Sequence, residues 1–434
     1  MQQYIKAASL KFLESSKNKH ITIISHFDTD GITSAAIMTR ALARMKKRFS
    51  VKIVKHLESE LLKELNGDLV LFLDLGSSFL ERLSHLNKEI IVIDHHEIPG
   101  KIPENITVVN PRIYGDEEIS AAGLTYLFCK ELDEKNRDLA NLAVIGMVGD
   151  MLDREIGKLN NDILKDAEIK IKKGLLIYPA TRPLHKTLEY SSGFYIPGVT
   201  GNSKGVFELL NDAGIKKENG SFKSIIDLNE EEMTRLITAV LLRKQDAVDL
   251  VGNIYLVKIF NKLEDARELS AMINACSRLG NSETALALCL NNKDAREKAE
   301  GIYAKYKQHI IQALKYVEEN KIEGKGYVII NAKNIIKDTI IGTISSIIAS
   351  SHLYSNGTVI LGLAYDNDKI KVSARVCGRE GRNVREILES ATKEIPEAEC
   401  GGHPMAAGCL INKAVEQEFI SKVVKALELE VIKV

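Results

Sequence analysis

The sequence predicts an α/β protein with two domains, an N-terminal domain built on a parallel sheet and a smaller C-terminal α/β domain, joined by a long helix. Three observations predict this fold class. At roughly 100–200 residues per domain, the 434 residues suffice for more than one core. Continuous Val/Ile/Leu runs separated by segments of helical period fill residues 20–150, which is typical of a parallel sheet covered on both faces. A charged amphipathic segment at 293–320 then precedes a second set of strands and helices.

The predicted strands of the N-terminal sheet are the apolar runs 21–27, 50–56, 68–75, 89–96 and 105–110. In parallel α/β sheets the ligand site lies at the carboxyl ends of the strands. Four of these runs end in polar residues of ligand type. We therefore expect the functional site at this edge of the sheet.

The following region is less regular. It predicts a helix at about 160–173, a long ordered loop rich in Pro, Gly and aromatic residues, and a helix at 229–246 with Asn229 as its N-cap. The remaining predicted elements are helices at 203–213, 265–280 and 282–290 and a strand at 253–260. We expect the first domain to span 1–290, with a helical and loop insertion at about 155–250.

The connector helix is predicted over 291–324 and the second domain over 325–434. The strands expected in this second domain are 327–333, 358–366 and 369–376, and its helices are 340–353 and 384–391.

Composition excludes several classes of protein. Lys plus Arg and Asp plus Glu number 59 each, so the formal net charge is zero and any nucleic-acid binding must come from a local basic groove. An apolar fraction of 45% with 27% charged residues excludes a disordered or fibrous chain. No stretch approaches the ~20 apolar residues of a membrane span, and the N-terminus lacks a signal-peptide apolar region. We expect a cytoplasmic protein without membrane contact.

The six cysteines show no C-x-x-C spacing, and most of them lie in apolar runs. We interpret them as reduced thiols in the core, in preference to disulfides or zinc ligands.

The segment HFDTDG (26–31) places His26, Asp28 and Asp30 directly after the first predicted strand. Alternate residues of an extended segment point the same way, so the three side chains are expected to converge. Gly31 would allow a sharp entry into the next helix. An N-cap alone would explain one of the two aspartates but not the whole set.

Further side chains of ligand type follow other buried segments. Asp74 ends the third run, Asp94, His95 and His96 end the fourth, and Asp150 ends the small-residue run 144–150. So many carboxylates at one sheet edge are destabilising unless cations neutralise them. The mixture of imidazole and carboxylate favours Mn²⁺, with Mg²⁺ as an alternative. Two ions sharing one carboxylate would suit in-line attack on a phosphorus centre.

The motifs that contain these residues resemble those of a known family. HFDTDG, LFLDLG, IDHH and VGD, in that order, resemble the four motifs of the DHH phosphoesterase superfamily, and GGHPMAAG (401–408) resembles the glycine-rich signature of its associated C-terminal domain. The segment MINACSRLG (272–280) and the loop 182–201 are similar to those of RecJ-like single-strand exonucleases, especially the archaeal branch. The chain is shorter than bacterial RecJ, and no additional OB-fold domain is visible.

The resemblance implies two groups of metal ligands that share Asp74. One Mn²⁺ would bind His26, Asp28 and Asp74, and the other would bind Asp30, Asp74, His95 and Asp150. Catalytic roles are implied for Asp94, His96 and His403. Asp94 would orient the ligands, and His96 would contact the scissile phosphate or help to protonate the leaving oxygen.

Three segments are expected to bind substrate phosphates. Gly401 and Gly402 offer backbone N–H groups free of side chains, and His403 can donate a hydrogen bond beside them. Ser373 and Arg375 are two residues apart on a predicted strand and therefore share one face, where they could contact a phosphate. The alternative interpretation is an exposed strand face without a binding function. Asn274 and Arg278 lie four residues apart on one side of a helix.

We therefore expect a manganese-dependent exonuclease that removes mononucleotides from single-stranded DNA or RNA, held between the two domains, in replication, repair or RNA turnover. Two alternatives stay open. One is a phosphodiesterase of short oligoribonucleotides or cyclic dinucleotides, and the other is a replication- or repair-complex subunit with a mainly scaffolding role. The sequence leaves open the polarity of digestion, the preference for DNA or RNA, homo-oligomerisation, and protein partners such as a helicase complex.

Overall fold

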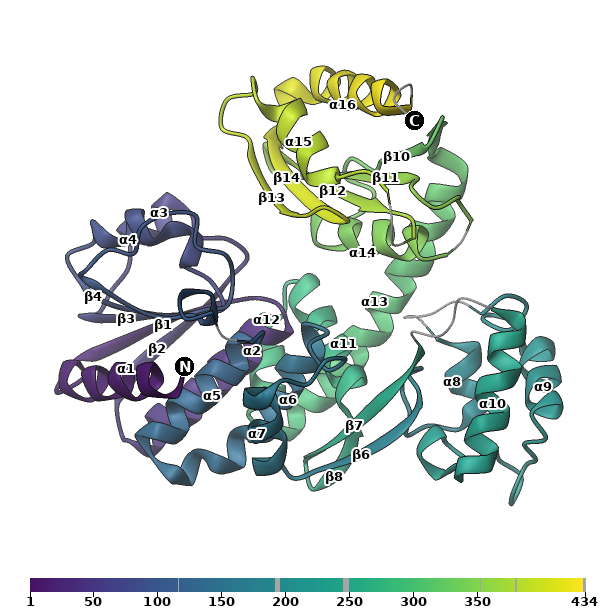
Figure 1. Cartoon of the computed structure of the whole chain (residues 1–434), viewed down its shortest axis with the longest axis horizontal. Helices are drawn as coiled ribbons and strands as arrows, with labels where there is room; N and C mark the ends of the chain where they lie inside the picture. The colour runs from purple at the N-terminus through teal and green to yellow at the C-terminus, as the bar shows by residue number, and fades with distance from the viewer. Residues whose placement is uncertain (116, 192–195, 245–249, 352, 379–380, 432–434) are drawn as a thin grey trace. The chain divides into compact units, whose positions relative to one another are not determined.

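The structure is a computed structural model that describes residues 1–115, 117–191, 196–244, 250–351, 353–378 and 381–431 (Figure 1). Their contacts divide the chain into two compact units, and the division falls between Tyr303 and Ala304, inside the single helix α13 (Lys293–Asn320). None of the described helices combines the length and hydrophobicity needed to cross a membrane. The two units are considered separately below.

The first unit contains a parallel sheet of five strands in the order β2-β1-β3-β4-β5, which confirms the predicted α/β class. The strands are β1 (His20–His26), β2 (Arg48–Val54), β3 (Leu69–Leu73), β4 (Glu89–Ile93) and β5 (Ile106–Val109). The chain leaves β1 for β2 on one side and returns to β3 on the other. Such a reversal opens a crevice at the carboxyl ends of the strands on either side of it, here β1 and β3. Ligands bind at this place in this class of sheet.

Both faces of this sheet are covered, which explains its continuous apolar strands. On one face, Ile24, Phe72 and Val92 pack against leucines of α3 (Ser59–Lys63) and α4 (Leu80–Ser84). On the other side α2 (Thr29–Arg44) contacts β1 and packs beside α5 (Ala121–Leu132) and α6 (Ala140–Gly149), while α1 (Gln2–Ser15) lies along α5 (Figure 1). This packing fixes α2, α5 and α6 around the edge where β1 and β3 end.

The predicted helix at 160–173 is only partly correct. Helix α7 spans Lys158–Asp166, and residues Ile169–Leu175 form strand β6. β6 pairs with β7 (Val251–Ile259), which pairs with β8 (Lys262–Asp265), in a separate antiparallel sheet. The prediction failed because Ile169-Lys-Ile-Lys alternates with the period of a strand, and its hydrogen-bond partner lies some 80 residues further along the chain.

The insertion is mainly helical. Asn229 caps α10 (Glu230–Arg243) as expected: its side chain accepts a hydrogen bond from the Glu232 backbone N–H, and the Glu232 carboxylate accepts one from the Asn229 N–H. The predicted long loop contains a short helix, α8 (Leu184–Glu189), and its residues 192–195 lie outside the described part. The other helices of this unit are α9 (Ser203–Asp212), α11 (Ala266–Arg278) and α12 (Ser282–Cys289).

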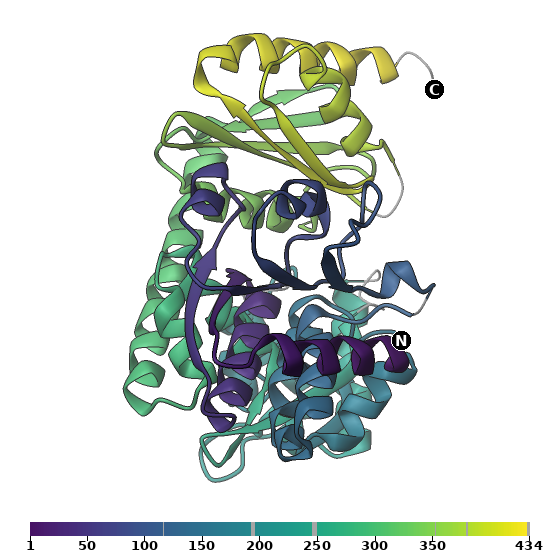
Figure 2. The ribbon, with the colours of Figure 1, turned by 90° about the vertical axis from the view of Figure 1, so that its left-hand side faces the viewer.

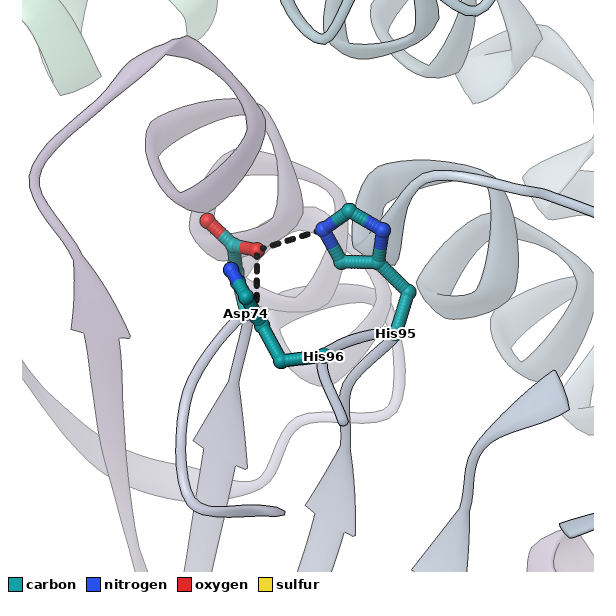
Figure 3. A group of neighbouring side chains, drawn as sticks. All are labelled: Asp74, His95 and His96. Atoms are coloured by element: carbon teal, nitrogen blue, oxygen red, sulfur yellow. Dashed lines mark ion pairs between the residues drawn. The ribbon is translucent and has the colours of Figure 1, made fainter. Parts of the chain in front are cut away.

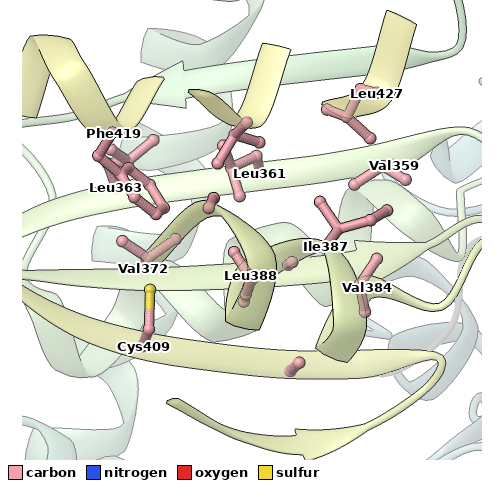
Figure 4. Packing of buried hydrophobic residues seen from close by; sticks show 14 of the residues in the cluster. Val359, Leu361, Leu363, Val372, Val384, Ile387, Leu388, Cys409, Phe419 and Leu427 are labelled. Carbon is pink, nitrogen blue, oxygen red and sulfur yellow. The ribbon is translucent and has the colours of Figure 1, made fainter. Parts of the chain in front are cut away.

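The second unit is built on a mixed sheet of six strands in the order β13-β14-β12-β11-β10-β9. The strands are β9 (Ile322–Gly324), β10 (Tyr327–Asn331), β11 (Val359–Asp366), β12 (Lys369–Val376), β13 (Glu399–His403) and β14 (Ala406–Asn412). One face of this sheet is covered by α15 (Val384–Thr392) and α16 (Glu416–Val431) (Figure 2). The core lies on this face, where Leu361, Val372 and Cys409 pack against residues of these two helices (Figure 4). Helix α14 (Asp338–Ala349) packs against β11 and β12. The segment GGHPMAAG is thus a hairpin of two strands.

Candidate functional site

The HFDTDG segment turns from strand to helix within two residues. β1 ends at His26, and Asp28 is the N-cap of α2, where its Oδ1 accepts a hydrogen bond of 3.0 Å from the Gly31 N–H. The aspartates therefore converge because one caps the helix and the other lies in its first turn, and not because the segment stays extended. Gly31 is required for close approach, since a Cβ there would lie 2.3 Å from the His26 carbonyl oxygen.

The N-terminus of α5 binds the carboxylate of Asp30, which lies in the first turn of α2. This carboxylate is fully buried, and its oxygens accept hydrogen bonds of 2.6 and 2.9 Å from the N–H groups of Ala121 and Ala122. Unpaired N–H groups at a helix N-terminus favour a carboxylate electrostatically. Gly146 of α6 leaves the necessary space, since a Cβ there would lie 2.6 Å from Asp30 Oδ1.

Asp74 lies between two histidines that come from different segments. It follows β3 with a left-handed φ of 60°, and its N–H donates to the Ile93 carbonyl. Its Oδ2 lies 3.3 Å from His26 Nδ1, and its Oδ1 lies 3.4 Å from His95 Nε2 (Figure 3). Both carboxylate oxygens are buried and neither accepts a hydrogen bond from the described residues. A buried carboxylate without donors is costly alone, and it fits a site that binds cations.

The described side chains form three groups whose ligand atoms lie within 4.8 Å of one another. They are His26 with Asp28 and Asp74, Asp30 with His95 and Asp150, and Asp74 with His95 and His96. In the second group His95 Nε2 lies 3.2 Å from Asp150 Oδ2 and 3.9 Å from Asp30 Oδ2. All six ligands proposed from the sequence thus meet at one edge of the sheet, on either side of Asp74.

Proton affinities in this cluster are strongly perturbed. Burial, and then repulsion by the charges of Asp28 and Asp30, raises the pKa of Asp74 well above its ordinary value. Burial, and then repulsion by the charges of Asp30 and Asp28, raises the pKa of Asp150 in the same way. Burial lowers the pKa of His26, but the charge of Asp28 and then that of Asp74 outweigh this effect and raise that pKa. The metal-free site therefore holds mutually repelling carboxylates, which divalent cations would relieve.

Asp94 is buried behind the cluster and accepts hydrogen bonds on both of its oxygens. Its Oδ1 accepts hydrogen bonds from the His95 N–H at 2.8 Å and from His96 Nδ1 at 2.7 Å, and its Oδ2 accepts one from the Ser77 N–H at 2.9 Å. Its placement suits the orienting role expected of it. His96 is 53% exposed at its side chain, so its ring can be reached by a ligand.

Sequence reasoning missed Asn110. Its Nδ2 donates to the His96 carbonyl oxygen and to Ser77 Oγ, both at 2.9 Å, so it fixes the backbone that carries the histidines. It directly follows β5, and the rule that polar residues at strand ends deserve inspection would have found it.

Asn274 of α11 lies against the start of α2. Its Oδ1 accepts a hydrogen bond of 3.1 Å from the Thr29 N–H, and the Thr29 hydroxyl donates to the Ser270 carbonyl oxygen at 3.0 Å. Asn274 therefore positions the first residue of α2, Thr29, which lies between Asp28 and Asp30, a role that the sequence did not predict. Arg278 lies one turn further along the same helix.

The proposed phosphate contacts of the second unit lie on and beside the β13–β14 hairpin. His403 pairs with Ala406, and Ala406 pairs with Arg375 of β12, so His403 and Arg375 face the same side of the sheet. Gly402 has φ of 126°, and a Cβ there would lie 2.6 Å from the Ala406 carbonyl oxygen, so only glycine fits. Gly401 is exposed, and a Cβ there would meet nothing within 4 Å.

Ser373 and Arg375 share that face but differ in access. Ser373 is buried, and a Cβ on Gly342 of α14 would lie 3.3 Å from its hydroxyl. Arg375 is half-buried, and its Nε donates to Ser346 Oγ at 3.0 Å. A phosphate would therefore reach the guanidinium more easily than the hydroxyl. Arg385, which the sequence did not single out, donates to the Gly402 carbonyl oxygen at 3.3 Å.

Three family models match the chain: the DHH family N-terminal domain over residues 20–147, the DHH-CID domain over 178–248, and the DHHA1 domain over 325–429. An uncharacterized protein of Methanocaldococcus jannaschii is 29% identical over 93% of this chain and 92% of its own length. The single-stranded-DNA-specific exonuclease RecJ of Thermus thermophilus is 30% identical, over 34% of this chain and 24% of RecJ. The chain thus spans a minor part of that curated exonuclease.

Solved structures show the same fold. RecJ of Thermus thermophilus in complex with Mn²⁺ superposes with a TM-score of 0.62 and 22% identity, covering 97% of this chain and 54% of RecJ. CDC45 of Entamoeba histolytica superposes with a TM-score of 0.66 and 12% identity, covering 98% of each chain.

Proposed function

Since the chain is a DHH-family, RecJ-like protein, we propose that it is a single-strand-specific exonuclease that hydrolyses terminal phosphodiester bonds of DNA or RNA with two divalent cations. The observation that carries the proposal is the placement of Asp74, whose two buried oxygens face His26 on one side and His95 on the other. One carboxylate placed in this way can be shared by two cations. The exonuclease names of the curated relatives support the same class of reaction.

The proposed ligand sets follow two of the three groups, with Asp74 added to the second. His26, Asp28 and Asp74 would hold one cation, and Asp30, Asp74, His95 and Asp150 the other. We propose Mn²⁺, with Mg²⁺ as the alternative, because imidazole and carboxylate are mixed in both sets. When bound, such cations lower the pKa of water and neutralise the charge that develops on a phosphate.

The protein's own groups would complete the chemistry. Asp94 holds the Nδ1 side of His96, which leaves Nε2 to contact the scissile phosphate or to donate a proton to the leaving oxygen. In the second unit, His403 and Arg375 would bind a phosphate of the strand, and the Gly401 and Gly402 backbone would approach it closely. Asn274 and Arg278 would support the metal-binding edge or a neighbouring phosphate.

Digestion of single strands labelled at either end tests the proposal. DNA and RNA strands are incubated with the full chain and Mn²⁺, Mg²⁺ or a chelator, with Asp74→Asn as the inactive variant and the surface change Asp162→Asn as a matched control. Stepwise loss of terminal nucleotides that needs the metal and Asp74 is expected. The labelled end that survives gives the polarity. Intact strands with either metal, or equal digestion by Asp74→Asn, would refute the proposed site.

The two alternatives predict other outcomes. A preference for two- to four-residue oligonucleotides or for a cyclic dinucleotide over a long strand would favour the small-substrate phosphodiesterase. The fold shared with CDC45 of Entamoeba histolytica is the observation that keeps the scaffolding alternative in view. Metal-binding without hydrolysis of any strand would favour that alternative. The full set of proposed ligands in this chain favours catalysis.

A further inference from the structure

Two of the six cysteines face each other across the β13–β14 hairpin. Cys400 of β13 is paired in register with Cys409 of β14. Residues directly opposite in antiparallel strands have Cα atoms about 4.5–5.5 Å apart, which falls within the range of about 4.4–6.8 Å that disulfides span. The strands thus already hold the two residues at a separation that a disulfide can bridge. The sequence did not reveal this pairing, because eight residues separate them and no short cysteine motif marks them.

The two thiols differ in access and in environment. Cys409 is 2% exposed and belongs to the core beneath α15 and α16 (Figure 4), whereas Cys400 is only partly buried. The Thr392 hydroxyl at the end of α15 lies 3.1 Å from Cys400 Sγ. A hydrogen bond with the Cys409 thiol lowers the pKa of Cys400 to about 7, although burial opposes this change, and the same contact raises the pKa of Cys409. Cys400 is therefore a thiolate in good part at neutral pH, and the thiolate is the reactive form.

None of the other four cysteines offers a thiol of lowered pKa. Cys129, Cys276, Cys289 and Cys377 are buried, and burial raises the pKa of each thiol. Buried thiols of high pKa react slowly with disulfides. Among the six cysteines, only Cys400 in the β13–β14 hairpin has a lowered pKa.

We propose that Cys400 and Cys409 form a reversible dithiol–disulfide pair that exchanges with a low-molecular-weight disulfide. The Cys400 thiolate attacks one sulfur of that disulfide, the disulfide bond breaks, and one thiolate leaves with the electron pair and takes up a proton. Cys409 then loses its proton and attacks Cys400 Sγ, which expels the second thiolate. Both protein thiols are oxidised and one small disulfide is reduced to two thiols. An excess of small thiol reverses each step.

The position of the pair gives the exchange a structural consequence. Cys400 directly precedes Gly401, and Cys409 directly follows Gly408, which pairs with Gly401. The cysteines face the core side of the sheet, whereas His403 and Arg375 face the other side. A disulfide would therefore fix the spacing of the two strands of the hairpin without occupying the face that carries His403.

The test incubates the full reduced chain with oxidised glutathione at neutral pH, stops the reaction with acid, and measures intact mass and peptides under non-reducing conditions. The wild type is expected to lose the mass of two thiol hydrogens, to retain no glutathione, to yield a linked peptide containing Cys400 and Cys409, and to recover with dithiothreitol. Cys409→Ala should stop at a glutathione adduct on Cys400, which should form more slowly than in the wild type because the hydrogen bond that lowers the Cys400 pKa is lost. Cys400→Ser should give neither product, and Cys377→Ser should behave as the wild type. The readout is mass, so it is independent of nuclease activity.

A folded wild type that gives no linked peptide, that accumulates only the mixed disulfide, or that links another pair would overturn the proposal. Formation of the same product by Cys400→Ser would do so as well. If Cys409→Ala fails to fold, as its circular dichroism would show, the comparison of Cys400→Ser with Cys377→Ser decides the question. An oxidised wild type should also melt at a higher temperature than the reduced protein, while Cys400→Ser shows no such shift.

Discussion

His96 Nδ1 donates a 2.7 Å hydrogen bond to Oδ1 of the buried Asp94. This bond gives two adjacent histidines different environments. The His95 ring turns its Nε2 toward the aspartates of the cluster, whereas the His96 ring is held from behind and stays exposed.

Asp94→Asn should lower the turnover number by about 10–100-fold, which is the usual effect of losing a carboxylate behind a metal site. The amide keeps the shape but can no longer accept all the hydrogen bonds from Ser77, His95 and His96. Steady-state hydrolysis of a labelled strand measures this effect. Mn²⁺ titration by calorimetry should show a smaller change, and an unaltered turnover number would contradict the orienting role of Asp94.

Asp74→Asn should raise the melting temperature of the metal-free protein, because it removes a carboxylate that Asp28 and Asp30 repel. In the wild type, a 100-fold excess of Mn²⁺ over its Kd should add about 2.7 kcal/mol of stability. The variant should lose most of that gain. Thermal melts with Mn²⁺ or a chelator measure both effects without any substrate, and an unchanged response to Mn²⁺ in the variant would contradict the shared-carboxylate site.

Asn274→Ala should weaken Mn²⁺ binding in the absence of substrate, because Asn274 fixes the Thr29 N–H between the two aspartates of α2. A residue that only contacts a phosphate would leave Mn²⁺ affinity unchanged and raise KM alone. Calorimetry on the free protein, followed by measurement of kcat and KM, separates the two roles. Glu283→Ala on the surface of α12 is a suitable control.

Gly31→Ala should destabilise the protein by about 1–3 kcal/mol, the usual cost of overpacking, and should abolish hydrolysis. The added methyl group would meet the His26 carbonyl oxygen and push this proposed metal ligand out of place. The matched control is Gly301→Ala in the exposed part of α13, where a Cβ meets nothing within 4 Å. That change should stabilise the protein by up to about 1 kcal/mol through helix propensity. Urea unfolding of both variants makes the comparison.

Asp166→Asn should alter the dependence of stability on pH. Burial raises the pKa of Asp166, but hydrogen bonds from Lys130 at 2.6 Å and Tyr126 at 2.8 Å outweigh this and lower the pKa below that of an unfolded carboxyl. The stabilisation is therefore fully present above the unfolded pKa and is lost as pH falls through the lower, folded value.

At pH 7 the Asp166→Asn variant should lose about 2 kcal/mol of unfolding free energy, as expected for hydrogen bonds to a charged group. The difference from the wild type should shrink as the solution is acidified. Urea unfolding between neutral and acidic pH measures it. The exposed pair of Glu231 with Arg235 provides the control, since Glu231→Gln should change stability by less than about 0.5 kcal/mol at any pH. A constant difference at every pH would argue against ionisation of Asp166 as the cause.

The amino-acid sequence by itself determined the α/β class, the strands of the parallel sheet and the residues that gather at its edge. These features can be predicted because the periodicity of apolar residues, the capping residues and the strand ends are local properties of the chain. Asn229 and α10 illustrate this. The sequence misjudged Ile169–Leu175, where the partner strand lies far away in sequence.

Only the tertiary structure decided the contacts between segments distant along the chain. The Asn274 hydrogen bond to Thr29, the helix terminus that holds Asp30, and the pairing of Cys400 with Cys409 all depend on how elements pack or register. The spacing of residues along the chain does not predict such contacts. Burial then decides the chemistry: the same packing that removes water from Asp74 raises its pKa and turns an acidic cluster into a site suited to cations.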